Sequence, residues 1–312
     1  MEIKFLIGVI EGYGDIELPE YLVSLRDAQT ERFFASGVRD FARVLEFFKG
    51  RRLWASAITN FSDSDYSQID YFWLSSRKHI SLTANAWDAN FETVDKINPI
   101  DKGGWAPINI PVGLAYATKL KQPRDIALLM DACAELVVSE VFFEKLKNLD
   151  QGLRGHTLFT GIRKQSIAKG VLQLAIDQFA LPAIISNAVG TVKGIYRKDI
   201  PGDENTHLGV PVLSRGMLGA HSGFMRSAEP WSGDLIPGWI VSKDIAERLA
   251  PMSKNVVLEP VLTEGTPLHA QHEEVWRKAR ACADVFKGFE WGGSWRTTDL
   301  APSIRQWAKR GR

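Results

Sequence analysis

An internal repeat is the feature of this sequence that most constrains its fold. The segment DACAELVVSEVFFEKL, which begins at Asp131, aligns without a gap with DLIPGWIVSKDIAERL, which begins at Asp234. In both copies a short apolar run ends at a serine, Ser139 or Ser242, and an amphipathic segment follows. A serine hydroxyl in this position can accept a hydrogen bond from a free N–H group in the first turn of a helix. Each copy therefore predicts a strand, a capping serine and a helix.

A second apolar run follows each copy, at residues 156–162 and 255–262. Strand, helix and strand in succession form a β–α–β unit, whose two strands commonly lie in one sheet. We therefore expect an α+β fold with a mixed sheet and two related β–α–β units. An N-terminal α/β region is expected over residues 1–125. A C-terminal region, which holds the second unit, is expected over residues 126–312.

Residue type and periodicity predict the other elements. Runs of β-forming side chains predict strands at residues 3–10, 53–58 and 71–74. Helices are expected at residues 27–48, in the first part of residues 123–148, at 167–185 and at 272–286. In these segments the apolar residues form long runs or recur with helical spacing.

Composition and charge exclude several classes of protein. The chain has 38 basic and 37 acidic residues, and it lacks the basic stripe with which proteins bind nucleic acid. The opening apolar run has no positively charged segment before it, and no run approaches the ~20 apolar residues of a membrane span. Cys133 and Cys282 are not spaced as a zinc-binding pair, so no cofactor is expected. We therefore expect a cytoplasmic protein that contacts neither nucleic acid nor membrane.

The second copy of the repeat, from WSGDL at residues 231–235 through IVS at 240–242 to LEPV at 258–261, resembles the immunity proteins of bacterial polymorphic toxin systems. Within these it is similar to the double-CXXCG and related immunity families, although the chain has no CXXCG pair. The resemblance implies a cytoplasmic protein that binds and neutralises a cognate toxin and catalyses no reaction of its own.

A complex of this kind depends on a few aromatic and arginine anchors and on local charge complementarity. Since the net charge is close to zero, the complementary patch must be local. We expect the partner to contact acidic residues in polar loops and tryptophans near glycines, namely Asp63, Asp65, Asp70, Trp105, Asp203, Glu204, Trp231 and Trp295.

Two alternatives remain open. His269 and His272 lie three residues apart beside Glu273 and Glu274, and could bind a metal ion in a metal-dependent hydrolase. The same residues can instead form the polar start of a helix, where carboxylates interact favourably with the helix dipole. A phage-derived structural or assembly protein would account for the ten tryptophans and for the lack of nucleotide-binding motifs.

Overall fold

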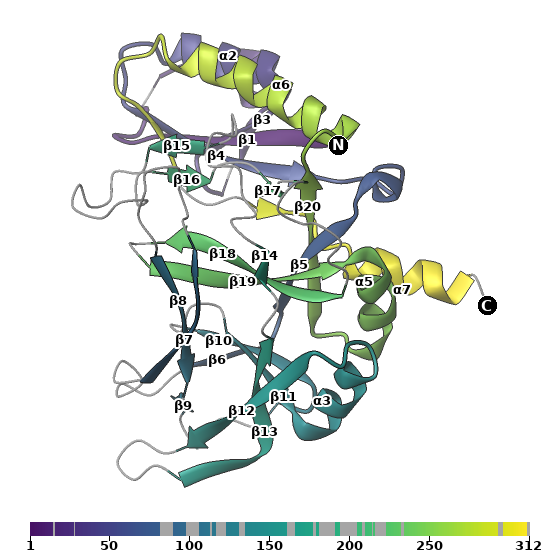
Figure 1. Cartoon of the computed structure of the whole chain (residues 1–312). Coiled ribbons are helices and arrows are strands. Elements are labelled where there is room, and N and C mark those ends of the chain that lie inside the picture. The colour runs from purple at the N-terminus through teal and green to yellow at the C-terminus, as the bar shows by residue number, and fades with distance from the viewer. Residues whose placement is uncertain are drawn as a thin grey trace.

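The computed structural model describes residues 1–14, 16–27, 29–81, 90–97, 106–112, 114–116, 123–130, 135–160, 166–176, 179–180, 191–193, 205–207, 210–213, 215, 223–231, 234–292 and 296–310. These residues form an α+β fold with three mixed sheets and one short two-stranded sheet. In Figure 1 the N-terminal sheet lies at the top, the sheet that contains β18 and β19 in the middle, and the sheet that contains β11 to β13 at the bottom. The expected fold class is confirmed.

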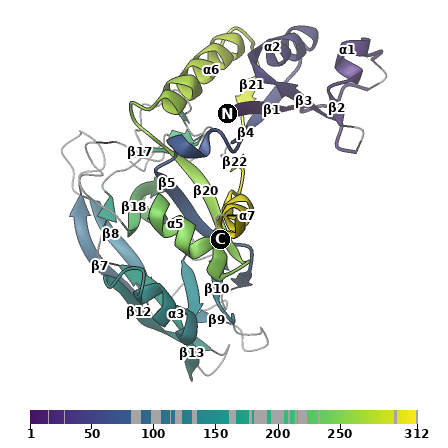
Figure 2. The same ribbon diagram turned by 90° about the vertical axis from the view of Figure 1, so that its right-hand side faces the viewer.

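The N-terminal sheet has the strand order β2-β3-β1-β4-β21, and β22 also pairs with β4. Its strands are β1 (Glu2–Val9), β2 (Arg26–Asp27), β3 (Arg32–Ser36), β4 (Leu53–Asn60), β21 (Phe289–Trp291) and β22 (Arg296–Thr297). Helices α2 (Gly37–Phe47) and α6 (Pro267–Ala283) pack on one face of this sheet, as Figures 1 and 2 show. Phe5, Phe33, Phe41 and Trp276 are fully buried between the sheet and these helices.

The first repeat unit comprises β10 (Ile126–Met130), β11 (Leu136–Ser139), α3 (Glu140–Lys147), β12 (Leu153–Thr160) and β13 (Ser166–Ile176). Its sheet has the order β6-β10-β11-β13-β12-β9. β13 is antiparallel to both β11 and β12, so these two strands run parallel to each other on either side of it. The unit is thus a β–α–β crossover with an antiparallel strand between its two parallel strands.

The second repeat unit comprises β18 (Phe224–Trp231), β19 (Asp234–Ser242), α5 (Lys243–Leu249), β20 (Val256–Thr263) and the earlier strand β5 (Tyr71–Ser76). Its sheet has the order β14-β18-β19-β5-β20-β17, and β8 also pairs with β19. β5 is antiparallel to both β19 and β20. The second unit therefore has the same strand order and directions as the first.

The remaining elements extend or connect these sheets. They are α1 (Glu20–Val23), η1 (Tyr66–Gln68), β6 (His79–Ser81), β7 (Asn90–Ile97), β8 (Ala106–Val112), β9 (Ala115–Tyr116), β14 (Phe179–Ala180), β15 (Thr191–Lys193), β16 (Asn205–His207), β17 (Val212–Leu213), η3 (Ala250–Met252) and α7 (Ala301–Arg310). In Figure 1 helix α7 lies beside α5 and leads to the C-terminus at the edge of the molecule.

Both units contribute to one apolar core. Phe142 and Leu146 of α3 and Ile245 and Leu249 of α5 are buried in the same cluster of side chains. Full burial of a side chain of this size stabilises the fold by about 1.5–3 kcal/mol. The two units therefore stabilise each other through a shared interior.

The serines of the repeat form different hydrogen bonds. Ser139 Oγ accepts from the backbone N–H of Phe142 at 3.2 Å, so its predicted capping role is confirmed. Ser242 Oγ accepts from the N–H of Gly223 at 3.0 Å and donates to Asp244 Oδ1 at 2.5 Å. The prediction that Ser242 caps α5 is wrong, because its hydroxyl binds the start of the neighbouring strand instead.

The helix expected at residues 27–48 begins only at Gly37. Before it, β3 has Phe33 and Ala35 buried and Phe34 exposed, the alternation that a strand requires. Gly37 has a φ angle of 78°, which glycine adopts readily, and it separates the strand from the helix. The large apolar residues on both sides of Gly37 pack in one core, which gave the segment the appearance of a single helix.

Residues 126–130 and 166–176 form strands, so the helices predicted there are wrong. β13 is paired on both edges, by β11 and β12. A central strand buried on both faces loses the alternation of apolar and polar residues and cannot be distinguished from a buried helix by pattern. The strands expected at residues 3–10, 53–58 and 71–74 are confirmed, and α6 covers most of the helix expected at 272–286.

Strands from both sides of the expected boundary at residue 125 share sheets. β21 and β22 join the N-terminal sheet, and β5 lies within the second unit. The division of the chain into regions 1–125 and 126–312 stays a prediction. Within the described ranges, no helix combines the length and the apolar character needed to cross a bilayer.

Candidate functional site

The N-terminal sheet has an open face, the side that is turned away from α2 and α6. The alternation of β1, β3 and β4 places six apolar or basic side chains on this face, namely Lys4, Leu6, Arg32, Phe34, Trp54 and Ile58, together with Glu2, Ser36, Ser56 and Asn60. Leu6 lies between Phe34 and Ser56 in the register of the three strands, and Lys4 lies opposite Ile58. The six apolar or basic side chains are half-buried or exposed, whereas their neighbours in sequence, apart from the exposed Glu31, are buried.

Trp54 lies across the middle of the open face. Gly8 is its partner in the register, and a Cβ atom at Gly8 would lie 2.3 Å from Trp54 Nε1. The guanidinium carbon of Arg32 lies 5.1 Å from the centroid of the Trp54 ring, within the range of a cation–π interaction. Gly8 thus lets the indole lie flat, and Arg32 stacks over it.

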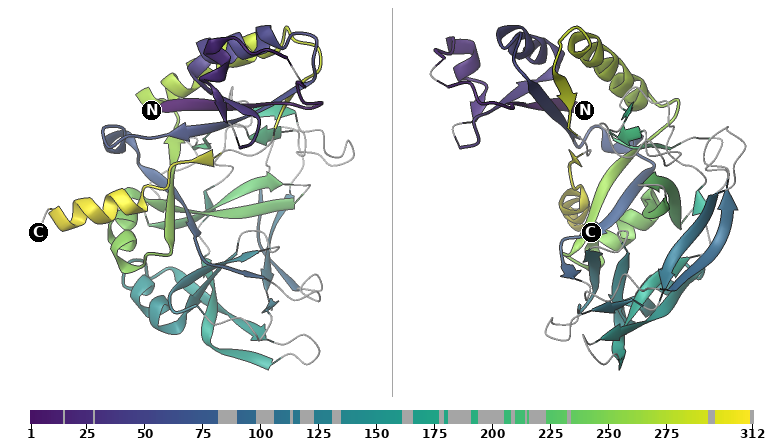
Figure 3. Two further views of the ribbon diagram at one scale, coloured as in Figure 1. Left: turned by 180° about the vertical axis from the view of Figure 1, so that it is seen from behind. Right: turned by 90° about the vertical axis from the view of Figure 1, so that its left-hand side faces the viewer.

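Two large apolar side chains near this stack are exposed to solvent. Phe34 is 38% exposed on the open face, and Ile10, which follows β1, is 39% exposed. Figure 2 and the right-hand view of Figure 3 show the β2–β3 end of the sheet and α1 projecting away from the other sheets. This end of the sheet is therefore accessible to a protein partner.

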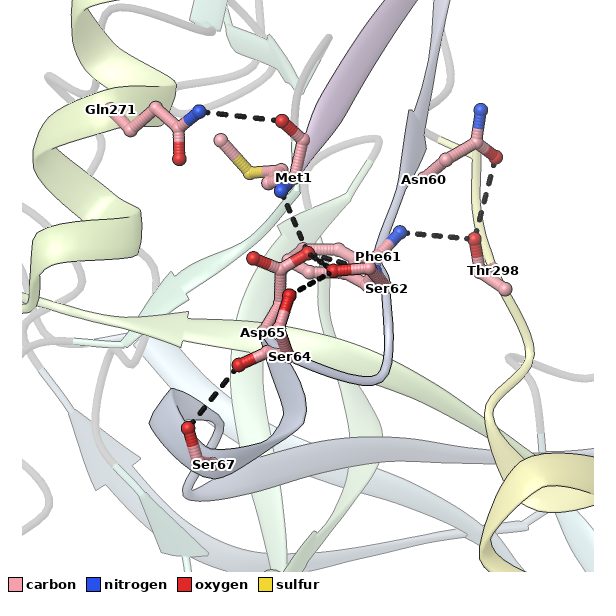
Figure 4. Close-up of polar contacts among 9 residues, drawn as sticks. All are labelled: Met1, Asn60, Phe61, Ser62, Ser64, Asp65, Ser67, Gln271 and Thr298. Carbon is pink, nitrogen blue, oxygen red and sulfur yellow. Dashed lines mark hydrogen bonds and ion pairs between the residues drawn. The ribbon is translucent and has the colours of Figure 1, made fainter.

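Asp65, one of the acidic residues expected to contact the partner, is only 7% exposed. Its carboxylate pairs with the amino group of Met1 at 2.7 Å and accepts hydrogen bonds from the backbone N–H and hydroxyl of Ser62, as Figure 4 shows. Burial by itself would raise the pKa of Asp65, but these hydrogen bonds lower it overall. Asp65 therefore holds the turn after β4 against the start of β1.

The contacts around Asp65 tie together distant parts of the chain. The amide of Gln271 in α6 donates to the carbonyl of Met1, and the hydroxyl of Thr298 accepts from the N–H of Phe61 (Figure 4). Asp63 and Asp70 lie on the same connection between β4 and β5, and both are exposed. Their contact with a partner stays a prediction.

Of the other predicted partner-binding residues, Trp231 alone lies within the described part of the chain. Trp231 ends β18 opposite Asp234. Trp105, Asp203, Glu204 and Trp295 lie outside the described residues.

The two histidines of the alternative metal site each accept a hydrogen bond from the backbone. His269 Nδ1 accepts from the N–H of Gly265 at 3.2 Å, and His272 Nε2 accepts from the N–H of Val210 at 3.1 Å. His269 Nε2 lies 3.3 Å from Glu273 Oε1. Burial lowers the pKa of His272 to about 3, so this ring is neutral at physiological pH. Across the described ranges, no three His, Cys, Asp or Glu side chains are grouped to hold a metal ion.

Sequence reasoning missed the open face. In β4 the buried residues Leu53, Ala55 and Ala57 alternate with half-buried ones, and this period of two was visible in the sequence. In β3 the same signal was hidden, because the segment was interpreted as part of a helix.

The comparisons with known proteins add no relative. No protein-family model matches the chain, and no curated protein matches its sequence.

Proposed function

We propose that this chain is a non-catalytic immunity protein that binds and neutralises a cognate bacterial toxin in the cytoplasm. Two observations support the proposal. One is the resemblance of residues 231–261 to immunity proteins. The other, which carries the argument, is the open face of the N-terminal sheet with its stacked Arg32 and Trp54 and its exposed Phe34.

The residue types on the open face suit an interface. Aromatic side chains and arginine supply most of the anchors in protein–protein interfaces. Arg32 and Trp54 already hold each other in place, so binding would immobilise them at a lower cost in side-chain entropy. A stable complex buries about 800 Å² on each partner, and contacts would extend from the open face to the neighbouring Ile10.

The charges of the open face indicate the chemistry of the partner surface. Lys4 and Arg32 are its cationic side chains, and Lys4 lies 3.5 Å from Glu2 at the rim. An arginine that is stacked on an indole keeps its N–H donors free at its edge, where a carboxylate can bind in bidentate fashion. The proposal therefore places carboxylates of the toxin against Arg32.

The test is co-expression with the product of the adjacent gene, followed by size-exclusion chromatography and a growth assay. Phe34→Thr should weaken the complex and reduce protection, because threonine keeps the strand but removes the aromatic anchor. Ile167→Thr in β13 is the matched control, since Ile167 is also an exposed strand residue, at 62%.

Three results would count against the proposal. The neighbouring protein could fail to co-elute with this chain, or could leave growth unaffected when expressed alone. If Phe34→Thr and Ile167→Thr had equal effects on the complex, the open face would not be part of the interface. Concentration-dependent self-association without a partner would instead favour an assembly protein.

A further inference from the structure

A groove of about 480 Å³ lies at the edge of the N-terminal sheet, beside the loop that follows β1. This volume falls within the range of small-molecule binding sites. Residues from the loop, from α1, from β2 and from the β2–β3 turn line it, among them Tyr13, Ile16, Leu18, Val23, Arg26 and Glu31. The groove is separate from the six apolar or basic residues of the open face.

Tyr13 supplies a buried donor beside this groove. Its side chain is 6% exposed, and its ring packs against Phe33 and Phe48 with centroid distances of 5.7 and 5.8 Å. The hydroxyl is buried and has no hydrogen-bond partner within the described part of the chain. Burial raises the pKa of Tyr13, so the phenol stays protonated and can donate. Buried polar groups without a partner are uncommon in folded proteins and call for an explanation.

Arg26 supplies a second donor. Its guanidinium carbon lies 5.2 Å from the centroid of the Tyr13 ring, so the guanidinium lies over the ring that carries the hydroxyl. Arg26 Nη2 lies 3.6 Å from Glu31 Oε1, which is too long for a hydrogen bond. The Arg26–Glu31 pair is solvent-exposed, and such pairs contribute little to stability. Arg26 can therefore exchange Glu31 for another carboxylate at small cost.

The groove also has an apolar side. Ile16, Leu18 and Val23 line it, and Val23 is 55% exposed. A ligand that covers these side chains would remove apolar surface from water, which is favourable by about 25 cal/mol for each Å² buried. The groove thus combines hydrogen-bond donors with an aliphatic surface.

We propose that this groove binds a small carboxylic acid with a short aliphatic tail. The carboxylate accepts hydrogen bonds from the Arg26 guanidinium and, once the side chains that bury it shift, from the Tyr13 hydroxyl, and the tail lies on Ile16, Leu18 and Val23. Glu31 competes with the ligand for Arg26. The proposal does not depend on the proposed immunity function, because it concerns a different part of the N-terminal sheet.

Hexanoate is a suitable probe, with hexanamide as its uncharged counterpart of the same length. A ligand of this size should bind the whole chain with a Kd of about 1 mM, measured by calorimetric titration or by ligand-observed NMR. Hexanamide should bind roughly tenfold more weakly, because it lacks the charge that Arg26 recognises. Failure of hexanoate to bind, or equal binding of the two probes, would overturn the proposal.

Variants distinguish a ligand-binding role of Tyr13 from a purely structural one. Tyr13→Phe removes the unpartnered hydroxyl and keeps the ring, so the melting temperature should not fall, while the Kd for hexanoate should rise roughly tenfold. Arg26→Met should have a similar effect on affinity. Glu31→Gln should tighten binding, since it removes the competing carboxylate.

Arg39→Met is the matched control for loss of a positive charge. Arg39 is exposed on α2 and does not line the groove, so this variant should bind hexanoate as the wild type does. Unchanged hexanoate affinity in both Tyr13→Phe and Arg26→Met would contradict the proposal. An equal loss of affinity in Arg39→Met and Arg26→Met would attribute binding to overall charge and would contradict it as well.

Discussion

The first and second repeat units arrange four strands and one helix in the same order. They differ in which part of the chain supplies the middle strand, the one that lies between the two parallel strands. In the first unit β13 follows β12 directly, whereas in the second unit β5 precedes the whole first unit in sequence. Hydrogen bonds between two strands form in the same way whether the strands are close together or far apart in the sequence. The two units therefore reach one topology by two chain paths.

The registers identify equivalent positions in the two middle strands. Val138 pairs with Leu172, and Val241 pairs with Phe72, so Gln173 and Trp73 occupy equivalent places. Gln173 donates to Glu135 at 3.0 Å in the first unit. In the second unit the repeat places glycine, Gly238, at the position of Glu135, and a Cβ there would lie 1.9 Å from the Trp73 ring.

The comparison shows how one site in a fold can be filled in two ways. The first unit fills it with a hydrogen-bonded polar pair, and the second with an indole lying against a glycine. Glu135 also pairs with Arg226 of β18, and both side chains are fully buried. The polar pair of the first unit therefore depends on a cation from the second, which couples the two units.

The largest effect is expected from breaking this coupling. Glu135→Leu removes the carboxylate that pairs with the buried Arg226, and should lower the free energy of unfolding by about 3–5 kcal/mol. Urea denaturation measures the change. Glu144→Gln on the exposed side of α3 is the control and should have little effect. If Glu135→Leu combined with Arg226→Met is as unstable as the sum of the single changes, the two residues are not coupled.

A smaller effect is expected at the equivalent glycine. Gly238→Ala forces the new methyl group into the Trp73 ring and should lower the free energy of unfolding by about 2–3 kcal/mol. Trp73→Leu in the same chain should relieve part of this loss by removing the ring. Additive effects in the double variant, measured by thermal or urea unfolding, would show that the two positions do not compete for space.

Glu259 in β20, the outer strand of the second unit, should make the stability of the protein depend on pH. Burial and the nearby Asp299 carboxylate raise the pKa of Glu259 from 4.5 to about 7. A raised pKa means that folding favours the protonated acid, so its contribution is complete below pH 4.5 and is lost as the pH rises through about 7. Glu259→Gln should therefore stabilise the protein at pH 8 by about 2 kcal/mol and leave it unchanged near pH 4. Equal stabilisation at both values, in urea denaturation, would contradict this assignment.

The smallest effect should distinguish the two repeat serines. Ser139→Asp keeps an acceptor for the N–H of Phe142 but loses the hydrogen bond that Ser139 Oγ donates to the carbonyl of Arg124 at 2.9 Å, so it should lower the free energy of unfolding by less than about 1 kcal/mol. Ser242→Asp places a second carboxylate beside Asp244 and loses the donor, so it should cost more than about 1 kcal/mol. The same cost at both positions in urea denaturation would mean that the two serines have one role.

The repeat predicted the elements of each unit that are adjacent in sequence, and it missed the strand that is inserted between them. A strand, a serine and a helix follow one another in sequence, and the structure confirms them at Ser139 and Ser242. The inserted strands could not be predicted, because the hydrogen bonds that fix β13 and β5 join segments that are distant in the chain. The continuous apolar run of β13 favoured a helix instead.

The candidate site was predictable only in part. Asp63 and Asp70 are exposed as expected, but the exposure of Asp65 depended on how the turn folded around it. An acidic residue beside Ser62 can face solvent or accept the hydrogen bonds of the turn, and residue type does not decide between the two. Predicting the open face would have required the register of β1, β3 and β4 relative to one another, and the sequence of a single segment does not contain that register.

The N-terminal sheet has a consequence for synthesis on the ribosome. Strands β1, β3 and β4 are made early, but α6, which covers Phe5 with Trp276, and β21, which pairs with the edge of β4, come from the end of the chain. At the usual speed of translation, roughly 10–50 s pass between the two. During this interval the nascent chain carries an aromatic face that only α2 covers and a free strand edge, both of which promote aggregation. A chaperone bound to the first 60 residues would have to be released before the last strands could pair.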